Sequence, residues 1–185
     1  MLVLASASPR RQELLRNAGV IFEVQPSDIL EDLLQGEKAK ACAERLAREK
    51  ALAIAQKRPN DPVLGADTVV VIDNQILNKP VDAPDAIRML RLLSGRTHQV
   101  ITGVCLALNA HLSVSSETTS VTMTEISEKE INDYVATGEP MDKAGAYAIQ
   151  GIASRWIPRI EGDYSNVVGL PVALVHRMLR QAGVI

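Results

Sequence analysis

A short strand leads directly into a helix near the N-terminus. Residues 2–5 are apolar like a buried strand, and Ser8 followed by Pro9 is the pairing that opens a helix, as N-cap and first-turn residue. The chain must therefore place a helix start against the end of a strand. Proteins often hold phosphate groups at such a junction, because free backbone N–H groups converge there.

Two arginines follow this helix start. Arg10 and Arg11 fall in its first turn, where the helix dipole already places partial positive charge and additional cations are unfavourable. Their presence indicates an anion, either a polyphosphate or a carboxylate, which the hydroxyls of Ser6 and Ser8 would also contact. The alternative is that both arginines are solvated or paired with Glu13 and other surface acids.

Strands and helices mix along the rest of the chain without strict alternation. A β-branched run spans residues 63–72, Asp73-Asn74 forms a hairpin turn, and two long strands at 97–108 and 112–124 are joined at Asn109-Ala110. Further helices are expected at 37–57, 82–93, between the capping box at Ser127 and Gly138, and at about 171–182. The pattern predicts an α/β fold on a mixed sheet and one domain spanning residues 1–185.

Composition excludes several classes of function. A net charge of -2 argues against a protein that binds nucleic acid by general electrostatics, and 3% aromatic content argues against a base-stacking platform. No apolar run approaches the roughly 20 residues that span a bilayer, so we expect no membrane association and a cytoplasmic location. Cys42 and Cys105 lack metal-ligand spacing and are interpreted as buried thiols.

Asp67 is the sharpest single candidate for chemistry. It lies inside the apolar run 63–71, where a carboxylate is costly unless it binds something. The Gly65-Ala66 pair before it leaves room for a ligand to approach the backbone. The functional interpretation is a metal ligand or a general base, and the alternative is an Asp that caps a turn at the strand end.

Other candidates are weaker when taken singly. Lys50, Lys79 and Glu31 are of types that are usually solvated. Gln150 closes a segment of small residues, and its amide offers both a donor and an acceptor to a base edge. The histidines have no partner spacing, and no catalysis is assigned to them; they are His98, His111 and His176.

The sequence also lacks a Walker-type phosphate loop and a dinucleotide fingerprint, which disfavours a P-loop ATPase or a Rossmann dehydrogenase. The remaining inventory is arginines, lysines, isolated acids and one amide. This combination is typical of a metal-dependent reaction on the phosphates of a nucleotide.

Several motifs together resemble the Maf nucleoside triphosphate pyrophosphatases, a family once described as septum-formation inhibitors. The resemblance runs nearly end to end. It rests on SASPRR at 6–11, GADT at 65–68, KP at 79–80, LSGRTH at 93–98, DKAGAYAIQG at 142–151 and GDYSNVVGLP at 162–171.

The resemblance implies hydrolysis of a nucleoside triphosphate between the α- and β-phosphorus with Mg²⁺ or Mn²⁺, and the α/β fold of inosine triphosphate pyrophosphatases, with two lobes around a cleft. It also implies a homodimer as a possible assembly.

The implied roles are carried over residue by residue. Asp67 matches the catalytic acid, Arg11 with Ser6 and Ser8 the phosphate loop, and Glu31, Lys50 and Lys79 the cleft, with Glu31 and Asp67 as metal ligands. Arg10, Thr68 and Gln150 match the positions of the branch that acts on dTTP and UTP. A Gln amide can accept from N3–H and donate to O4 of uracil or thymine, which agrees with that branch.

The expected mechanism is in-line attack of water on the α-phosphorus. Asp67 either deprotonates that water or holds the metal, and the sequence leaves these two roles open. Arg11, Lys50 and Lys79 would stabilise the pyrophosphate leaving group. Two other functions also stay open: a nucleotide-binding regulator of cell division, and an enzyme that clears modified nucleotides.

Overall fold

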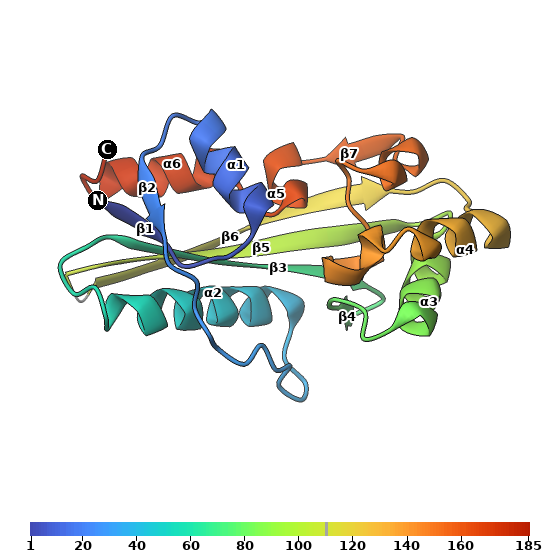
Figure 1. Cartoon of the computed structure of the whole chain (residues 1–185), viewed down its shortest axis with the longest axis horizontal. Coiled ribbons are helices and arrows are strands. Elements are labelled where there is room, and N and C mark those ends of the chain that lie inside the picture. The colour runs from blue at the N-terminus through green and yellow to red at the C-terminus, as the bar shows by residue number, and fades with distance from the viewer. Residues whose placement is uncertain (110) are drawn as a thin grey trace.

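The computed structural model describes residues 1–109 and 111–185, and its centre is one mixed sheet (Figure 1). The sheet has seven strands in the order β2-β1-β3-β5-β6-β7, with β4 paired to β3. β1 runs parallel to both β2 and β3, and the other pairs are antiparallel, as the mixed pattern predicts. The strands are β1 Leu2–Leu4, β2 Phe22–Val24, β3 Val63–Ile72, β4 Gln75–Leu77, β5 Thr97–Leu108, β6 His111–Thr122 and β7 Arg159–Glu161.

The predicted helices are all present, with ends that differ by one or two residues. Ser8 caps the first helix by accepting from the backbone N–H of Arg11, and Ser127 with Glu130 forms the expected capping box. The α-helices are α1 Pro9–Asn17, α2 Ala39–Ala55, α3 Ala83–Leu93, α4 Glu128–Ala136, α5 Tyr164–Val168 and α6 Val172–Gln181.

Residues 139–169 contain more structure than their sequence indicates. Three short 3-10 helices, η1 Glu139–Asp142, η2 Ala144–Ala146 and η3 Ile152–Trp156, precede β7 and α5. Each of these elements is three to five residues long. Elements this short leave no 3.6-residue periodicity in a Gly- and Ala-rich segment, which is why the pattern misses them.

The turns behave as the sequence predicts. Asp73 and Asn74 both have positive φ, 49° and 61°, as the tight turn between β3 and β4 requires. Asn109 also has a positive φ of 50°, whereas Ala110, the other half of the predicted β5–β6 turn, lies outside the described residues.

β3 runs through the Gly65–Thr68 segment without a break, because it pairs with β5 along this stretch, and α2 packs directly on it. A Cβ built at Gly65 would lie 2.2 Å from the carbonyl oxygen of Ala47, and one built at Gly103 on β5 would lie 2.3 Å from that of Ala43. These glycines therefore let the helix approach the sheet closely.

The helices cover the two faces of the sheet and one of its ends. In Figure 1, α1, α5 and α6 lie on one face, α2 lies on the other, and α3 with α4 lies at the far end. Separate apolar clusters fill these contacts: Leu4 and Leu179 belong to the first, Ala51 and Cys105 to the second, and Leu90 and Tyr134 to the third. Both cysteines are buried thiols, as expected.

The strand lengths leave a gap beside β3. β1 pairs with β3 only as far as Leu64, and β4 pairs with β3 only from Val70 onward. The intervening part of that edge faces the start of α1 instead of a strand. Ligands in open α/β sheets bind at such a place, beyond the carboxyl end of a parallel strand. In residues 1–109 and 111–185, no helix is both long and apolar enough to cross a membrane.

Candidate active site

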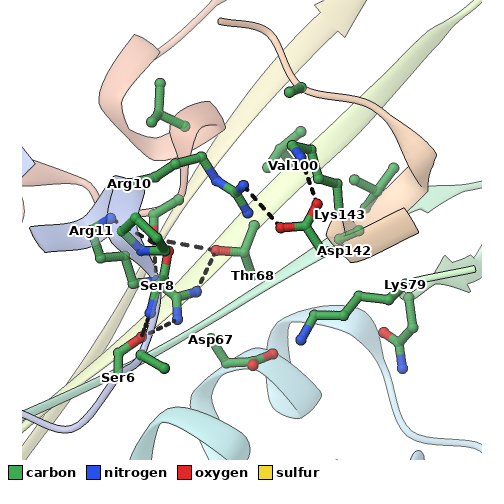
Figure 2. Close-up of a pocket in the computed structure, with 18 of the residues that line it drawn as sticks. Ser6, Ser8, Arg10, Arg11, Asp67, Thr68, Lys79, Val100, Asp142 and Lys143 are labelled. Atoms are coloured by element: carbon green, nitrogen blue, oxygen red, sulfur yellow. Dashed lines mark hydrogen bonds and ion pairs between the residues drawn. The ribbon is translucent and has the colours of Figure 1, made fainter. Parts of the chain in front are cut away.

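A cleft of about 570 Å³ opens at this gap, and every candidate site residue from the sequence lines it (Figure 2). The walls come from the β1–α1 loop, β3, α2, the segment after β4, and the segment around η1 and η2. These residues are far apart in the chain, so the fold alone brings them together. The lining includes Ser6, Ser8, Arg10, Arg11, Glu31, Lys50, Asp67, Thr68, Lys79 and Gln150.

Arg11 is held by three neutral acceptors. Its Nε donates to the carbonyl of Gly169 at 2.7 Å, Nη1 to Ser6 Oγ at 3.2 Å, and Nη2 to Thr68 Oγ1 at 3.0 Å. Burial lowers the pKa of Arg11, with the charges of Asp67 and Glu31 opposing that shift. Within the described residues Arg11 forms no ion pair with a carboxylate, so its charge is available to an anion in the cleft.

Arg10 points across the cleft to the opposite wall. Figure 2 shows its guanidinium directed at Asp142, with Nη1 3.5 Å from Oδ2 of that residue. Lys143 Nζ lies 2.6 Å from the other carboxylate oxygen of Asp142. The alternative of a pairing with Glu13 is therefore not what the structure shows for Arg10.

Two carboxylates converge on one buried lysine on the α2 side of the cleft. Lys50 Nζ lies 2.6 Å from Asp67 Oδ1 and 2.7 Å from Glu31 Oε1. Lys79 Nζ is 4.0 Å from the second oxygen of Glu31. Lys50 and Asp67 are both 6% exposed, so this ion pair is shielded from bulk water.

The pKa values of Asp67 and Glu31 are shifted in opposite directions. Burial raises the pKa of Asp67, Glu31 adds to that shift, and the charges of Lys50 and Arg11 oppose it. For Glu31, burial acts to raise the pKa, but Lys50 and then Lys79 hold it below the ordinary value. A group with a raised pKa beside one with a lowered pKa is a common property of sites that move protons.

Gln150 lies in the turn that follows η2, where it is exposed and lines the cleft. Its amide makes no hydrogen bond to another described side chain, so both of its functional groups are available. The same wall contributes Lys143, which sequence reasoning weighed only as a usually solvated lysine in a loop fixed by glycine, and two residues that it did not select, Asp142 and Tyr147. The only signal for Asp142 and Tyr147 was their place in the small-residue segment 142–151.

Tyr147 is anchored by a buried histidine. Its hydroxyl lies 2.7 Å from His98 Nε2, and the two rings meet edge to face at 5.4 Å between centroids. Burial lowers the pKa of His98 to about 4, which keeps the ring neutral. His98 is thus a structural partner of the cleft wall, in agreement with its having been assigned no catalysis.

The cleft is positive although the chain is not. Five cationic side chains line it, whereas its carboxylates are Glu31, Asp67 and Asp142. The formal balance is five minus three, or plus two, against a net charge of -2 for the whole chain. A polyanionic ligand therefore meets its complementary charge here.

The donor set also fits a hard divalent cation. Among the described residues there is no group of three or more His, Cys, Asp or Glu side chains that could hold a metal ion by itself. Mg²⁺ does not need such a group, because it is commonly bound by one or two carboxylates together with substrate phosphates. Asp67 and Glu31 supply two carboxylates on one wall of a cleft that is otherwise suited to phosphates.

Comparisons with known proteins identify the family of this chain. The Maf-like protein family model matches residues 1–182. A dTTP/UTP pyrophosphatase of Koribacter versatilis is 60% identical over 184 residues, covering 100% of this chain and 95% of that protein. Proteins of the same name from Geobacter sulfurreducens and Symbiobacterium thermophilum are 51% and 50% identical; they cover 98% of this chain, and 96% and 94% of their own length is matched. The chain belongs to the Maf family.

Proposed function

We propose that this protein hydrolyses nucleoside triphosphates, dTTP and UTP first, to the nucleoside monophosphate and pyrophosphate. The observation that carries the proposal is a positive cleft in which two acids and a lysine lie opposite an arginine, Arg11, that has no acidic partner among the described residues. The names of the relatives support the same activity.

The reaction breaks the bond between the α-phosphorus and the oxygen that bridges it to the β-phosphorus. Water forms the new bond to the α-phosphorus and loses its proton, and the bridging oxygen leaves with pyrophosphate. The main contribution of a protein to such a step is positioning and charge stabilisation. The cleft residues supply both.

Asp67 is the group that we assign to the attacking water. Lys50 Nζ donates to Oδ1 of Asp67 at 2.6 Å, and within the described residues Oδ2 of Asp67 accepts no hydrogen bond. The raised pKa of Asp67 makes it a better proton acceptor than an ordinary aspartate. Lys50 fixes the orientation of the carboxylate and keeps Glu31 beside it.

Three cationic side chains of the cleft are assigned to the phosphates of the substrate. Arg11 presents its guanidinium next to Ser6 at the start of α1, where the free backbone amides of the helix also point. Lys79 reaches into the cleft from the opposite side and is 61% exposed at its side chain, which lets it follow a leaving pyrophosphate. We assign Arg11, Lys50 and Lys79 to the negative charge that develops on the leaving group.

A divalent cation completes the charge balance. The triphosphate carries roughly four negative charges near neutral pH, and the cleft offers a formal plus two. Mg²⁺ or Mn²⁺ held by Glu31 together with the substrate phosphates would supply the rest and polarise the α-phosphoryl oxygens when bound, which leaves Oδ2 of Asp67 to the water. The metal is part of the proposal and is tested with it.

Base selection is assigned to Gln150 with Arg10 and Thr68. The Gln150 amide can pair with N3–H and O4, which uracil and thymine share and cytosine presents differently. A site built to hydrogen-bond those atoms rejects bases that leave its polar groups unpaired.

The residues that form the site all come from one chain, and we propose that residues 1–185 form a single functional domain. A homodimer stays a prediction, which sedimentation analysis would test.

The test is product analysis of the purified protein with Mg²⁺, Mn²⁺ or chelator on dTTP, UTP, CTP, GTP, ATP, ITP and 7-methyl-GTP. We expect pyrophosphate and monophosphate from dTTP and UTP only when metal is present. Release of single phosphate instead would contradict attack at the α-phosphorus. Preference for ITP or modified bases would favour clearance of modified nucleotides, and tight dTTP binding without any product would favour the regulatory role.

A further inference from the structure

Besides Ser6 in the loop before α1, Arg11 has two acceptors that belong to different elements. One is Thr68 on β3, and the other is the carbonyl of Gly169, which follows α5 directly. For Arg11 to keep one orientation, β3 and the end of α5 must stay in register. The structure contains a buried side chain that joins them.

Thr102 on β5 is that side chain. It is fully buried, with 0% exposure, and it is absent from the cleft lining. Thr102 is the direct cross-strand partner of Thr68, so the two side chains lie on the same face of the sheet, 2.9 Å apart between hydroxyl oxygens. Its Oγ1 also lies 3.2 Å from the backbone carbonyl of Asn166 in α5.

The direction of each hydrogen bond follows from these contacts. The Thr102 hydroxyl donates to the Asn166 carbonyl at 3.2 Å, because the competing arrangement needs Thr68 to donate over 3.4 Å to the Gly169 carbonyl, which already accepts from Arg11 Nε. Thr102 Oγ1 then accepts from Thr68, and this uses the only hydroxyl proton of Thr68. The lone pairs of Thr68 remain for Arg11 Nη2 at 3.0 Å. The chain of donors therefore runs in one direction, from Arg11 through Thr68 and Thr102 to α5.

α5 is fixed independently on its other side. The Asn166 amide nitrogen donates to the Val100 carbonyl at 3.1 Å and to Thr119 Oγ1 at 2.9 Å. The helix is thereby tied to β5 and β6, and the Gly169 carbonyl that accepts from Arg11 is held with it. Both acceptors of Arg11, Thr68 and the Gly169 carbonyl, are therefore held in place by contacts with β5.

We propose that Thr102 is a positioning residue for phosphate binding, which sets the orientation of Arg11 through Thr68 without touching the substrate. This inference rests on the proposed function and names a residue that the proposed function does not use. Without the Thr102 hydroxyl, Thr68 can donate only to the Gly169 carbonyl at 3.4 Å, where it competes with Arg11 Nε. Arg11 would then lose its single orientation.

The test compares Thr102→Val, which keeps the shape and removes the hydroxyl, with Thr102→Ser, which keeps the hydroxyl. For Thr102→Val we expect KM for dTTP to rise about 5- to 10-fold, the effect of one or two lost hydrogen bonds, with kcat changed less than KM. Thr102→Ser should stay within about twofold of the unaltered protein. If Thr102→Val leaves KM unchanged, or if Thr102→Ser fails to restore it, the inference is wrong.

Thr97→Val is the matched control. Thr97 is also on β5, and its hydroxyl also pairs with a cross-strand threonine, Thr122, at 2.9 Å, but it is exposed and away from the cleft. This control loses the same kind of bond and should keep the KM of the unaltered protein. A KM rise equal to that of Thr102→Val would mean that any threonine pair in the sheet has this effect, and would overturn the inference.

A double-mutant cycle tests whether the effect passes through Thr68. The variant Thr68→Val/Thr102→Val should have nearly the KM of Thr68→Val alone, because the other contact of Thr102, with the Asn166 carbonyl in α5, is backed by the two bonds of the Asn166 amide. Multiplied effects would contradict the inference. Thermal unfolding accompanies each assay, and Thr102→Ala replaces Thr102→Val if that variant does not fold. If the unaltered protein releases no pyrophosphate, the proposed function fails. If it is active and Thr102→Val leaves its KM for dTTP unchanged, only this inference is refuted.

Discussion

Asp67 shows how far single residues can be interpreted from sequence. Its position in an apolar strand indicates a functional carboxylate, because burial of an unpaired charge is costly. Its partner could not be identified in the same way, since Lys50 is one of two lysines on α2, with Lys40, and pairs with Asp67 only when that helix packs on β3. The same holds for Asp142, an ordinary acid until the fold places it across from Arg10.

The lowered pKa of His98 predicts how the stability of the protein depends on pH. The folded pKa of about 4 lies below the ordinary value of 6.5, so between these values the unfolded chain binds the extra proton and stability falls as pH falls. From pH 7 to about pH 5 this contributes a loss on the order of 2 kcal/mol. In His98→Phe that part of the loss should disappear. Urea unfolding at the two pH values measures it, and an unchanged pH dependence in the variant would show that His98 does not titrate as described.

At the scale of elements, the sequence predicts long strands and capped helices well. β3, β5 and α3 have periodic patterns and clear end signals, and they appear within one residue of their expected bounds. The segment from η1 to α5 escapes prediction, because its short elements are held by tertiary contacts such as Asn166 with β5 and β6. Ten of the 28 residues that line the cleft therefore come from residues 139–169, the part of the chain with the weakest local signal.

Substitution of Gly65 tests how closely α2 packs on the sheet. In Gly65→Ala the new methyl group would lie 2.2 Å from the Ala47 carbonyl, so the helix must move away and carry Lys50 with it. We expect a loss of about 3 kcal/mol in the free energy of unfolding, together with lower activity. Gly183→Ala near the C-terminus, where a Cβ meets open space, should cost about 1 kcal/mol through its positive φ alone. Equal losses in the two variants, measured by urea unfolding, would argue against close packing at Gly65.

The whole molecule separates its charges. The chain has a net charge of -2, yet the cleft has a formal plus two, a difference that composition could not reveal. This arrangement favours a polyanion in the cleft over the remainder of the chain, whose net charge is negative.

Screening of the cleft charge gives the prediction at this scale. Raising the salt from about 50 mM to about 200 mM should raise KM for dTTP roughly threefold and leave kcat almost unchanged, because exposed cations such as Lys79 are screened more than the shielded Lys50–Asp67 pair. Steady-state kinetics over this range measures the effect. A KM independent of salt would mean that electrostatic attraction contributes little to binding.

The central claim is that Asp67 activates water for attack on the α-phosphorus in this cleft. The most direct measurement is pyrophosphate release from dTTP with Mg²⁺ by the unaltered protein, by Asp67→Asn, and by Asp133→Asn, a surface control paired with Lys129 on α4. The account predicts that Asp67→Asn loses at least about 100-fold in kcat while calorimetry still detects dTTP binding, and that Asp133→Asn is unchanged. Normal turnover in Asp67→Asn would contradict it.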